Sequence, residues 1–226
     1  MNDLERNGGA QRKVLLAGAT GLVGKSLLQG LLADDSVSSV HALLRRQVDI
    51  SHRKLTTHLT DFSSLPALPP LDEVYLALGT TIKVAGSQAA FRAVDFDANL
   101  AVAKAARDAG ATRAGLVSAM GADVRSSLFY SRVKGELEDA LAGLGFSALV
   151  IARPSMLVGD CEALGQPVRS GERIALHAGR LLRPFIPANY LPVNASDVAA
   201  ALLARVPAAR GREVLLSGAM QPARRH

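Results

Sequence analysis

Hydrophobic residues fall into short unbroken runs that alternate with longer stretches of helical spacing. Continuous apolar runs are typical of strands buried on both faces of a parallel sheet, whereas apolar residues recurring every three or four positions indicate helices. The predicted strands are Lys13–Ala17, Val37–Leu44, Lys54–Leu59, Glu73–Leu78, Arg113–Ser118, Ser147–Ala152 and Glu213–Leu216. The predicted helices are Leu22–Ala33, Gln88–Ala109, Ser127–Leu144 and Ala195–Arg205.

Strands that alternate with helices of this length predict right-handed βαβ units. We therefore expect an α/β fold: a doubly wound, mostly parallel Rossmann-type sheet with helices on both faces. A single domain is expected over residues 12–218, with disordered tails at 1–11 and 219–226. Residues 159–192 are the least regular. Because ligands bind beyond the carboxyl ends of the strands in such folds, this short C-terminal segment is expected to cover the substrate side.

Composition narrows the class of protein further. Of 226 residues, 49% are hydrophobic but only 4% are aromatic and none is Trp, so Ala, Val and Leu must build the core. The single cysteine, Cys161, excludes an internal disulfide framework and any multi-cysteine metal site. The five histidines are scattered and are interpreted as surface or packing residues, so no metal is expected.

The net charge of +6 comes from arginines that are dispersed along the chain rather than clustered. Dispersed charge favours a solvated basic surface over a nucleic-acid interface. Residues 1–12 are polar and lack the apolar stretch of a signal peptide, and no apolar run reaches membrane-spanning length. We expect a soluble cytoplasmic protein, a monomer or homodimer, that binds neither nucleic acid nor membrane.

A glycine-rich loop with the sequence GATGLVG joins the first strand to the first helix. At this junction Gly18 permits a tight turn, Gly21 lets the backbone approach a pyrophosphate, and Gly24 lets helix and strand pack closely. The helix N-terminus then offers free N–H groups to phosphates. The loop predicts a dinucleotide site that includes Gly18, Thr20, Gly21, Leu22, Val23 and Gly24.

The same loop also matches a relaxed nucleoside-triphosphate P-loop, because Gly-Lys-Ser follows Ala19 after four residues. The apolar stripe of Val23, Leu27 and Leu31 indicates that the helix begins before Lys25, whereas a P-loop keeps its lysine at the helix start. No later strand ends in an Asp that would hold Mg²⁺. Lys25 is therefore interpreted as an exposed helix residue.

The end of the second strand bears on the choice of dinucleotide. An NAD enzyme usually places an acidic residue there to bind the ribose 2′-hydroxyl, but this strand is followed by Arg45 and Arg46. Guanidinium groups suit a 2′-phosphate. NADP(H) is therefore expected in preference to NAD(H), although Asp49 is near enough in sequence to leave the ribose-binding alternative open.

Tyr130 and Lys134 are four residues apart on a predicted helix and so lie on one helix face. A free tyrosine has a pKa of about 10, and a neighbouring ammonium lowers it. Such a pair can donate and accept a proton at an alcohol or carbonyl. Ser118, at a strand end, is expected to orient the substrate oxygen. It is not interpreted as a hydrolase nucleophile, because its surroundings read GxxSxxG rather than GxSxG.

These motifs together resemble the short-chain dehydrogenase/reductase superfamily, from Arg12 to Gly218. The GATGLVG loop is similar to that of the extended and atypical branches. The segments LALGTT at 76–81, 126–136 and Ala-Arg-Pro at 152–154 resemble the atypical group of the Tat-interacting oxidoreductase-like proteins. The resemblance implies an NAD(P)-binding Rossmann fold and an oxidoreductase activity.

By this resemblance Ser118, Tyr130 and Lys134 are the catalytic residues, and Lys134 also binds the nicotinamide ribose. The resemblance implies further cofactor contacts from Asp61 and Phe62 at the adenine, Leu78 and Gly79 on the adenosine side, and Pro154 near the nicotinamide. Many members carry an additional Asn that completes a proton relay. Asp95 and Asn99 lie in that region here, but neither aligns with it convincingly.

The leading functional hypothesis is an NADP(H)-dependent oxidoreductase that transfers hydride between the nicotinamide and a carbonyl or alcohol substrate. The alternative is a dinucleotide-binding regulatory or redox-sensing protein with little turnover. The intact Ser118–Tyr130–Lys134 set favours the enzyme. An epimerase or dehydratase would share these residues, but the short C-terminal part argues against that class. Residues 167–192 are expected to line the substrate pocket.

Overall fold

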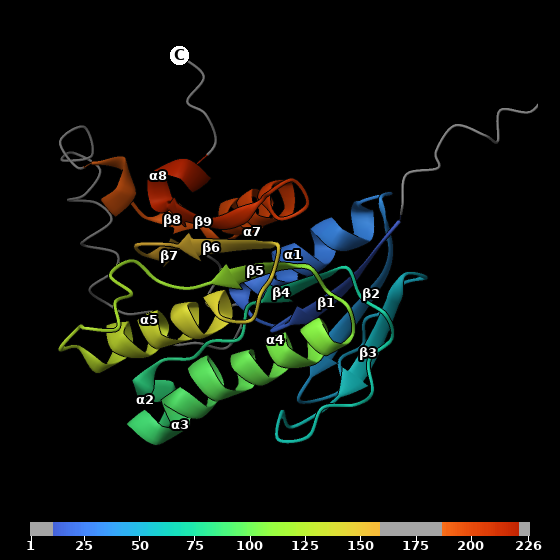
Figure 1. The fold of residues 1–226 in the computed structure, drawn as a ribbon, viewed down its shortest axis with the longest axis horizontal. Helices are drawn as coiled ribbons and strands as arrows, with labels where there is room; N and C mark the ends of the chain where they lie inside the picture. The colour runs from blue at the N-terminus through green and yellow to red at the C-terminus, as the bar shows by residue number, and fades with distance from the viewer. Residues whose placement is uncertain (1–10, 159–186, 222–226) are drawn as a thin grey trace, which may run out of the picture.

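Seven parallel strands form the central sheet of the computed structural model, which describes residues 11–158 and 187–221 (Figure 1). Their spatial order is β3-β2-β1-β4-β5-β6-β9, and every neighbouring pair is parallel. The predicted doubly wound α/β fold is confirmed. The strands are β1 (Arg12–Ala17), β2 (Val37–Leu44), β3 (Leu55–Leu59), β4 (Glu73–Leu76), β5 (Arg113–Val117), β6 (Ala148–Arg153) and β9 (Gly211–Leu216).

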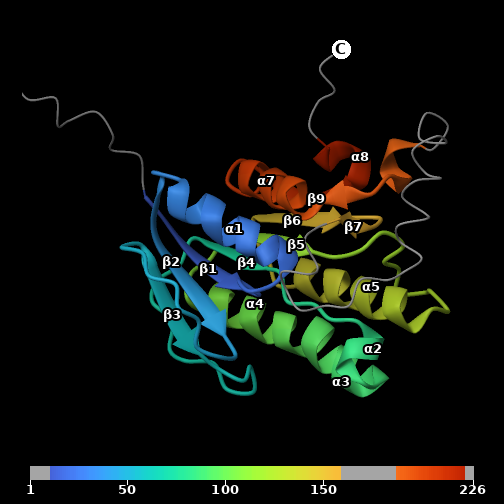
Figure 2. The same cartoon turned by 180° about the vertical axis from the view of Figure 1, so that it is seen from behind.

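Helices cover both faces of the sheet, as Figure 2 also shows from behind. On one face lie α1 (Leu22–Ala33), α7 (Ala195–Arg205) and the short α8 (Ser217–Met220), and their apolar side chains form one buried cluster with the sheet. On the other face lie α4 (Asn99–Asp108) and α5 (Phe129–Ala142), which bury a second cluster. This two-sided burial explains the continuous apolar runs of the central strands.

The strand order reverses at β1: after β3 the chain returns across the sheet, and β4 pairs with the other edge of β1. Strands β2 and β3 lie on one side of β1, whereas β4, β5 and β6 continue on the other. In open α/β sheets the crevice at this switch point, beyond the carboxyl ends of the strands, is where ligands bind. The loops that follow β1 and β4 therefore flank the expected cofactor crevice.

The long helix predicted over Gln88–Ala109 is divided into three parts. It consists of α3 (Gln88–Arg92), the π-helix η1 (Ala93–Ala98) and α4. The amide nitrogen of Asn99 donates to the carbonyl oxygens of Val94 and Asp95, 3.3 and 3.1 Å away, so its side chain satisfies backbone acceptors at the wide turn. Helical periodicity alone does not reveal such a turn.

Several short elements were not predicted, because they are too short to show a period. They are α2 (Ile82–Ala85), the 3₁₀ turn η4 (Ala188–Tyr190), the paired strands β7 (Leu157–Val158) and β8 (Val193–Asn194), and α8. Strands β4 and β5 also end earlier than predicted, at Leu76 and Val117. Residues 159–186 of the expected cover, which include Cys161, lie outside the described residues.

A buried charge cluster stands at the amino end of the sheet, away from the crevice. Arg12 donates to Glu73, with Nη1 2.7 Å from Oε2, and it also binds Asp34. The hydroxyl of Tyr75 donates to the same Glu73 oxygen at 3.2 Å. Burial raises the pKa of Glu73, and the Arg12 guanidinium opposes that rise. The cluster joins β1 to β4 and has a structural role.

Candidate active site

The three glycines of the β1–α1 loop are required for different reasons. Gly18 has φ of +91°, and a Cβ there would lie 2.3 Å from the carbonyl oxygen of Ala77 after β4. A Cβ on Gly24 would lie 1.9 Å from the carbonyl oxygen of Gly18. A Cβ on Gly21 would meet nothing closer than 3.4 Å. Protein packing thus demands glycine at 18 and 24 but leaves the space beside Gly21 open.

The N-terminus of α1 has no capping side chain. Gly21 occupies the N-cap position, and the first turn contains no acidic residue. By contrast, Thr81 and Ser87 accept hydrogen bonds from the first turns of α2 and α3. The first N–H groups of α1 therefore have no side-chain acceptor, and together with the helix dipole they suit an anion.

The remaining loop residues divide between the surface and the core. Thr20 and Leu22 are half-buried, whereas the side chain of Val23 is buried in the core. Lys25 is exposed on α1, which begins three residues earlier, at Leu22. The lysine is thus not at the helix start, and the geometry disfavours the P-loop alternative.

Arg45 and Arg46 directly follow the last residue of β2 and are both exposed. Strand β2 is the neighbour of β1 in the sheet, so these arginines lie on the β2 side of the glycine loop. Asp49 is also exposed. The described residues give the arginines no ion-pair partner.

The other predicted cofactor contacts occupy the loops after β3 and β4. Asp61 is exposed and accepts hydrogen bonds from the hydroxyl and backbone N–H of Ser63, which lower the pKa of its carboxyl. Phe62 adopts a left-handed conformation with φ of +67° and packs partly against the α4-side core. Leu78 is half-buried and Gly79 is exposed beside the crevice.

Tyr130 and Lys134 occupy successive turns of α5, as predicted. The ring of Tyr130 packs on Phe91 of α3, with centroids 5.4 Å apart, yet 37% of the residue remains exposed. Lys134 is buried, and its Nζ lies 2.7 Å from Oδ1 of Asp95 in η1. The partly exposed Tyr130 and the buried Lys134 therefore lie one helical turn apart, and the ammonium of Lys134 is paired with a carboxylate.

Ser118 lies at the end of β5, but its side chain is not free. The residue is 5% exposed, and its hydroxyl donates to Oε1 of Glu138 on α5. Glu138 is fully buried and also binds Arg153 through two oxygens, with Nη2 2.6 Å from Oε2. Arg212 reaches the same carboxylate at 3.2 Å. The structure thus brings Ser118 to a buried ion cluster, and its expected contact with substrate stays a prediction.

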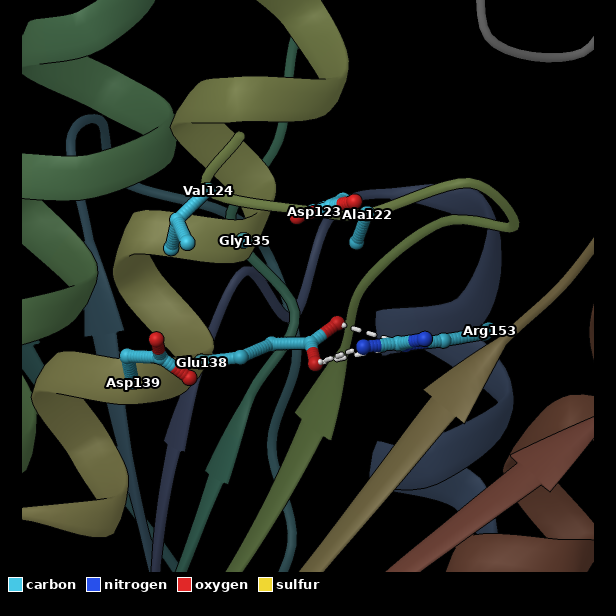
Figure 3. A pocket seen from close by; sticks show the side chains of 7 residues that line it. All are labelled: Ala122, Asp123, Val124, Gly135, Glu138, Asp139 and Arg153. Carbon is cyan, nitrogen blue, oxygen red and sulfur yellow. Dashed lines mark hydrogen bonds and ion pairs between the residues drawn. The ribbon is translucent and has the colours of Figure 1, made fainter. Parts of the chain in front are cut away.

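A pocket of about 300 Å³ opens beside this cluster, between α5, the loop after β5 and the end of β6 (Figure 3). Figure 3 shows the side chains of Glu138 and Arg153, two of the residues that line it, pointing toward each other. The hydrogen bonds that Arg153 donates to the Glu138 carboxylate raise the pKa of Arg153. Pro154 is buried next to it, and its carbonyl accepts from the N–H of Met120, which joins the β5 and β6 loops. The guanidinium of Arg153 is thus bound within the ion cluster, where it neutralises Glu138.

Two pairings escaped the sequence interpretation, that of Asp95 with Lys134 and that of His41 with His58. Asp95 interrupts an apolar helical stripe that includes Phe91, Ala98 and Val102, and this acid on a buried face was the available signal. His41 and His58, interpreted separately, lie together with ring nitrogens 3.1 Å apart. In the described parts of the chain, no three His, Cys, Asp or Glu side chains gather as a metal site, and no helix has the length and apolarity to cross a bilayer.

Comparison with known proteins gives the chain a family. No family model matches it. The protein fmp52, mitochondrial, of Emericella nidulans is 41% identical over 159 residues, covering 66% of this chain and 68% of that protein. The protein FMP52, mitochondrial, of Candida albicans is 35% identical over 192 residues, covering 81% and 82%. These relatives bear the name Fmp52, so the finer resemblance to the Tat-interacting group is not supported.

Solved structures share the fold at low identity. UDP-glucose 4-epimerase from Thermotoga maritima superposes with a TM-score of 0.68 at 15% identity, covering 91% of this chain and 77% of that one. The enzyme WbmF of Bordetella bronchiseptica, solved in complex with NAD⁺, gives 0.67 at 18% identity, covering 94% and 75%. The fold is thus the one found in NAD-binding Rossmann enzymes.

The relatives also correct the expected location. The cytoplasmic expectation is wrong, because the similar curated proteins are named mitochondrial. It relied on the polar character of residues 1–12, which does not determine the compartment. Identity above 30% over more than two thirds of these relatives places the chain among them: it belongs to the Fmp52 family.

Proposed function

We propose that the protein is an NADP(H)-dependent oxidoreductase that acts on a carbonyl or alcohol, with Tyr130 as its proton donor and acceptor. The observation that carries this proposal is the exposed phenol of Tyr130 one helical turn from the buried ammonium of Lys134. Both side chains lie on α5, which follows β5 at the carboxyl edge of the sheet. The glycine loop stands at the same edge, after β1.

The described residues fit a dinucleotide. Gly21 leaves open space where packing does not demand a glycine, and the α1 N-terminus lacks a side-chain cap. These features would hold the pyrophosphate, and Leu78 and Gly79 would line the adenosine side of the crevice. Arg45 and Arg46 would bind the 2′-phosphate that distinguishes NADP(H) from NAD(H). The nicotinamide, when bound, supplies the hydride chemistry.

The protein's own contribution is to orient the substrate and handle the proton. General acid–base catalysis by a positioned side chain contributes about 10²- to 10⁴-fold to a rate. Tyr130 can reach a substrate oxygen because its side chain remains partly exposed. In this proposal Lys134 supplies the positive charge beside the phenol. The hydroxyl of Ser118 is bound to Glu138 and so links α5 to the end of β5, beside its predicted role at the substrate.

Calorimetric titration with NADPH and NADH tests the binding half of the proposal. We expect the wild type to bind NADPH more tightly than NADH. Gly21→Ala should fold normally, because its Cβ has room, and should lose nucleotide affinity at least tenfold. Lys25→Ala, a change at an exposed position of the same helix, should bind as the wild type does. Binding of ATP with Mg²⁺ but of neither dinucleotide would overturn the proposal.

Turnover tests the catalytic half. Oxidation of NADPH should be followed with a panel of aldehydes and ketones, comparing the wild type with Tyr130→Phe. The variant should lose kcat by about 10²-fold or more while keeping its NADPH affinity, because only the proton donor is removed. Equal rates in the two proteins would exclude the assigned role. Tight NADPH binding with no turnover of any substrate would instead favour a regulatory, dinucleotide-sensing protein.

A further inference from the structure

The carboxylate that pairs with Lys134 is nearly inaccessible to solvent. The side chains of Lys134 and Asp95 are 5% and 1% exposed, and Nζ lies 2.7 Å from Oδ1. A buried charge is tolerated only when it is paired. Asp95 lies in η1 and Lys134 in α5, so the ion pair joins two helices on the same face of the sheet.

Asp95 also binds the loop after β4. Its second oxygen, Oδ2, accepts a hydrogen bond of 2.8 Å from the backbone N–H of Thr80, in the loop after β4. Asn99 donates to the carbonyl oxygen of Leu78 at 3.1 Å, which ties the same loop to the start of α4. The two oxygens of Asp95 therefore connect the β4 loop on one side with Lys134 on the other.

The π-helix places this carboxylate in its position. Wide π turns within α-helices are frequent at functional sites. Here the turn spans Ala93–Ala98, and the amide of Asn99 satisfies the carbonyl oxygens of Val94 and Asp95. An ionised carboxylate in the middle of a buried helical face is costly unless an opposite charge or hydrogen-bond donors compensate it.

We propose that Asp95 is a positioning residue that sets the place of the Lys134 ammonium relative to the β4 loop. The inference rests on the proposed function, in which Lys134 supplies the positive charge beside the phenol of Tyr130 and Leu78 and Gly79 line the adenosine side. It also takes up the ribose contact of Lys134 that the resemblance to the short-chain dehydrogenases implies. One carboxylate binds both Nζ of Lys134 and the backbone N–H of Thr80, so it fixes α5 relative to the β4 loop. The ammonium is thus ordered before the dinucleotide binds, so less ordering is needed on binding.

A double-mutant cycle on NADPH affinity tests the proposal. The variants are Asp95→Asn, Lys134→Met and the two combined, with Asp97→Asn as a control at an exposed acid of the same π-helix. Each is titrated calorimetrically with NADPH, and the thermal unfolding of each nucleotide-free protein is recorded. We expect Asp95→Asn to weaken NADPH about fivefold or more, and Lys134→Met about tenfold. The double variant should be no weaker than Lys134→Met alone, because Asp95 acts through Lys134.

Other results would distinguish failure of the positioning proposal from failure of the proposed function. If Asp95→Asn weakens NADPH equally with and without Lys134, its role is structural and the positioning proposal is overturned. Wild-type affinity in Asp95→Asn would overturn it too. If the wild type itself binds neither NADPH nor NADH, the proposed function fails, and the positioning role falls with it. Wild-type affinity in Asp97→Asn confirms that any loss at position 95 is not a general effect of charge on η1.

Discussion

The hydroxyl of Ser118 and the buried carboxylate of Glu138 are hydrogen-bonded to each other across the β5–α5 interface. Glu138 lies one turn beyond Lys134 on α5, and it also binds Arg153 at the end of β6. Ser118 thus helps to fix the helix that carries Tyr130 and Lys134. The same serine was expected from sequence to bind the substrate, and the two roles have different consequences on mutation.

Ser118→Ala distinguishes these roles. If the serine is structural, the variant should lose about 1–3 kcal/mol of unfolding free energy, the cost of leaving a buried partner without its hydrogen bond. Its kcat/KM should fall by less than about tenfold, far less than that of Tyr130→Phe. Urea unfolding and steady-state kinetics measure both quantities. A stable variant that is as inactive as Tyr130→Phe would restore the substrate-binding role.

Replacing Arg45 and Arg46 by Ala tests the preference for the phosphorylated dinucleotide. Hydrogen bonds to charged groups contribute about 1.5–3 kcal/mol, so the dissociation constant of NADPH should rise about 10- to 100-fold. That of NADH should hardly change, because NADH lacks the 2′-phosphate. Arg53→Ala, at another exposed arginine between β2 and β3, is the control for the loss of one positive charge in this region. Equal weakening of both nucleotides would show that the arginines do not read the phosphate.

The sheet, the main helices and the glycine loop could be predicted from the sequence because their signals are local. The central strands β1, β4, β5 and β6 contain contiguous apolar runs, and the loop at residues 18–24 follows the first of them directly. The structure adds that glycine is demanded by packing at 18 and 24 but not at 21. The pattern of apolar and polar positions cannot supply that distinction, since it depends on how closely the carbonyl oxygens of Ala77 and Gly18 approach positions 18 and 24.

The pairings of the candidate site could not be predicted, because they join distant parts of the chain. Asp95 meets Lys134 only after η1 and α5 pack on the same face of the sheet. Ser118 meets Glu138 through the same packing. Periodicity shows which face of a helix is buried, but it does not show which polar group on another element will satisfy a charge on that face. A buried acid on an apolar stripe signals that a partner exists without naming it.

Arg12→Met should destabilise the fold strongly while leaving the candidate site intact. The substitution leaves fully buried Glu73 without its cation, and breaking a buried ion pair costs about 3–5 kcal/mol. Because burial already raises the pKa of Glu73, losing Arg12 should raise it further, so the deficit should shrink at acidic pH, where the carboxyl is protonated. Chemical unfolding at neutral and acidic pH measures both effects. The double variant Arg12→Met/Glu73→Gln should recover much of the loss, and wild-type stability in Arg12→Met would refute the argument.

The histidine pair on β2 and β3 should make stability fall as the pH falls. Burial, aided by neighbouring His58 and Lys13, lowers the pKa of His41 from its ordinary 6.5. Above about pH 6.5 both folded and unfolded chains keep this imidazole neutral. Below about pH 6.5, His41 of the unfolded chain binds a proton, whereas His41 of the folded chain stays neutral until the pH reaches its lower pKa. Stability is therefore lost as the pH falls from about 6.5 to the folded-state pKa. His41→Gln should reduce the fall in melting temperature between about pH 7.5 and about pH 5.5. His52→Gln, at an exposed histidine nearby in the chain, should leave that fall unchanged. An undiminished fall in His41→Gln would mean that other groups set the acid sensitivity.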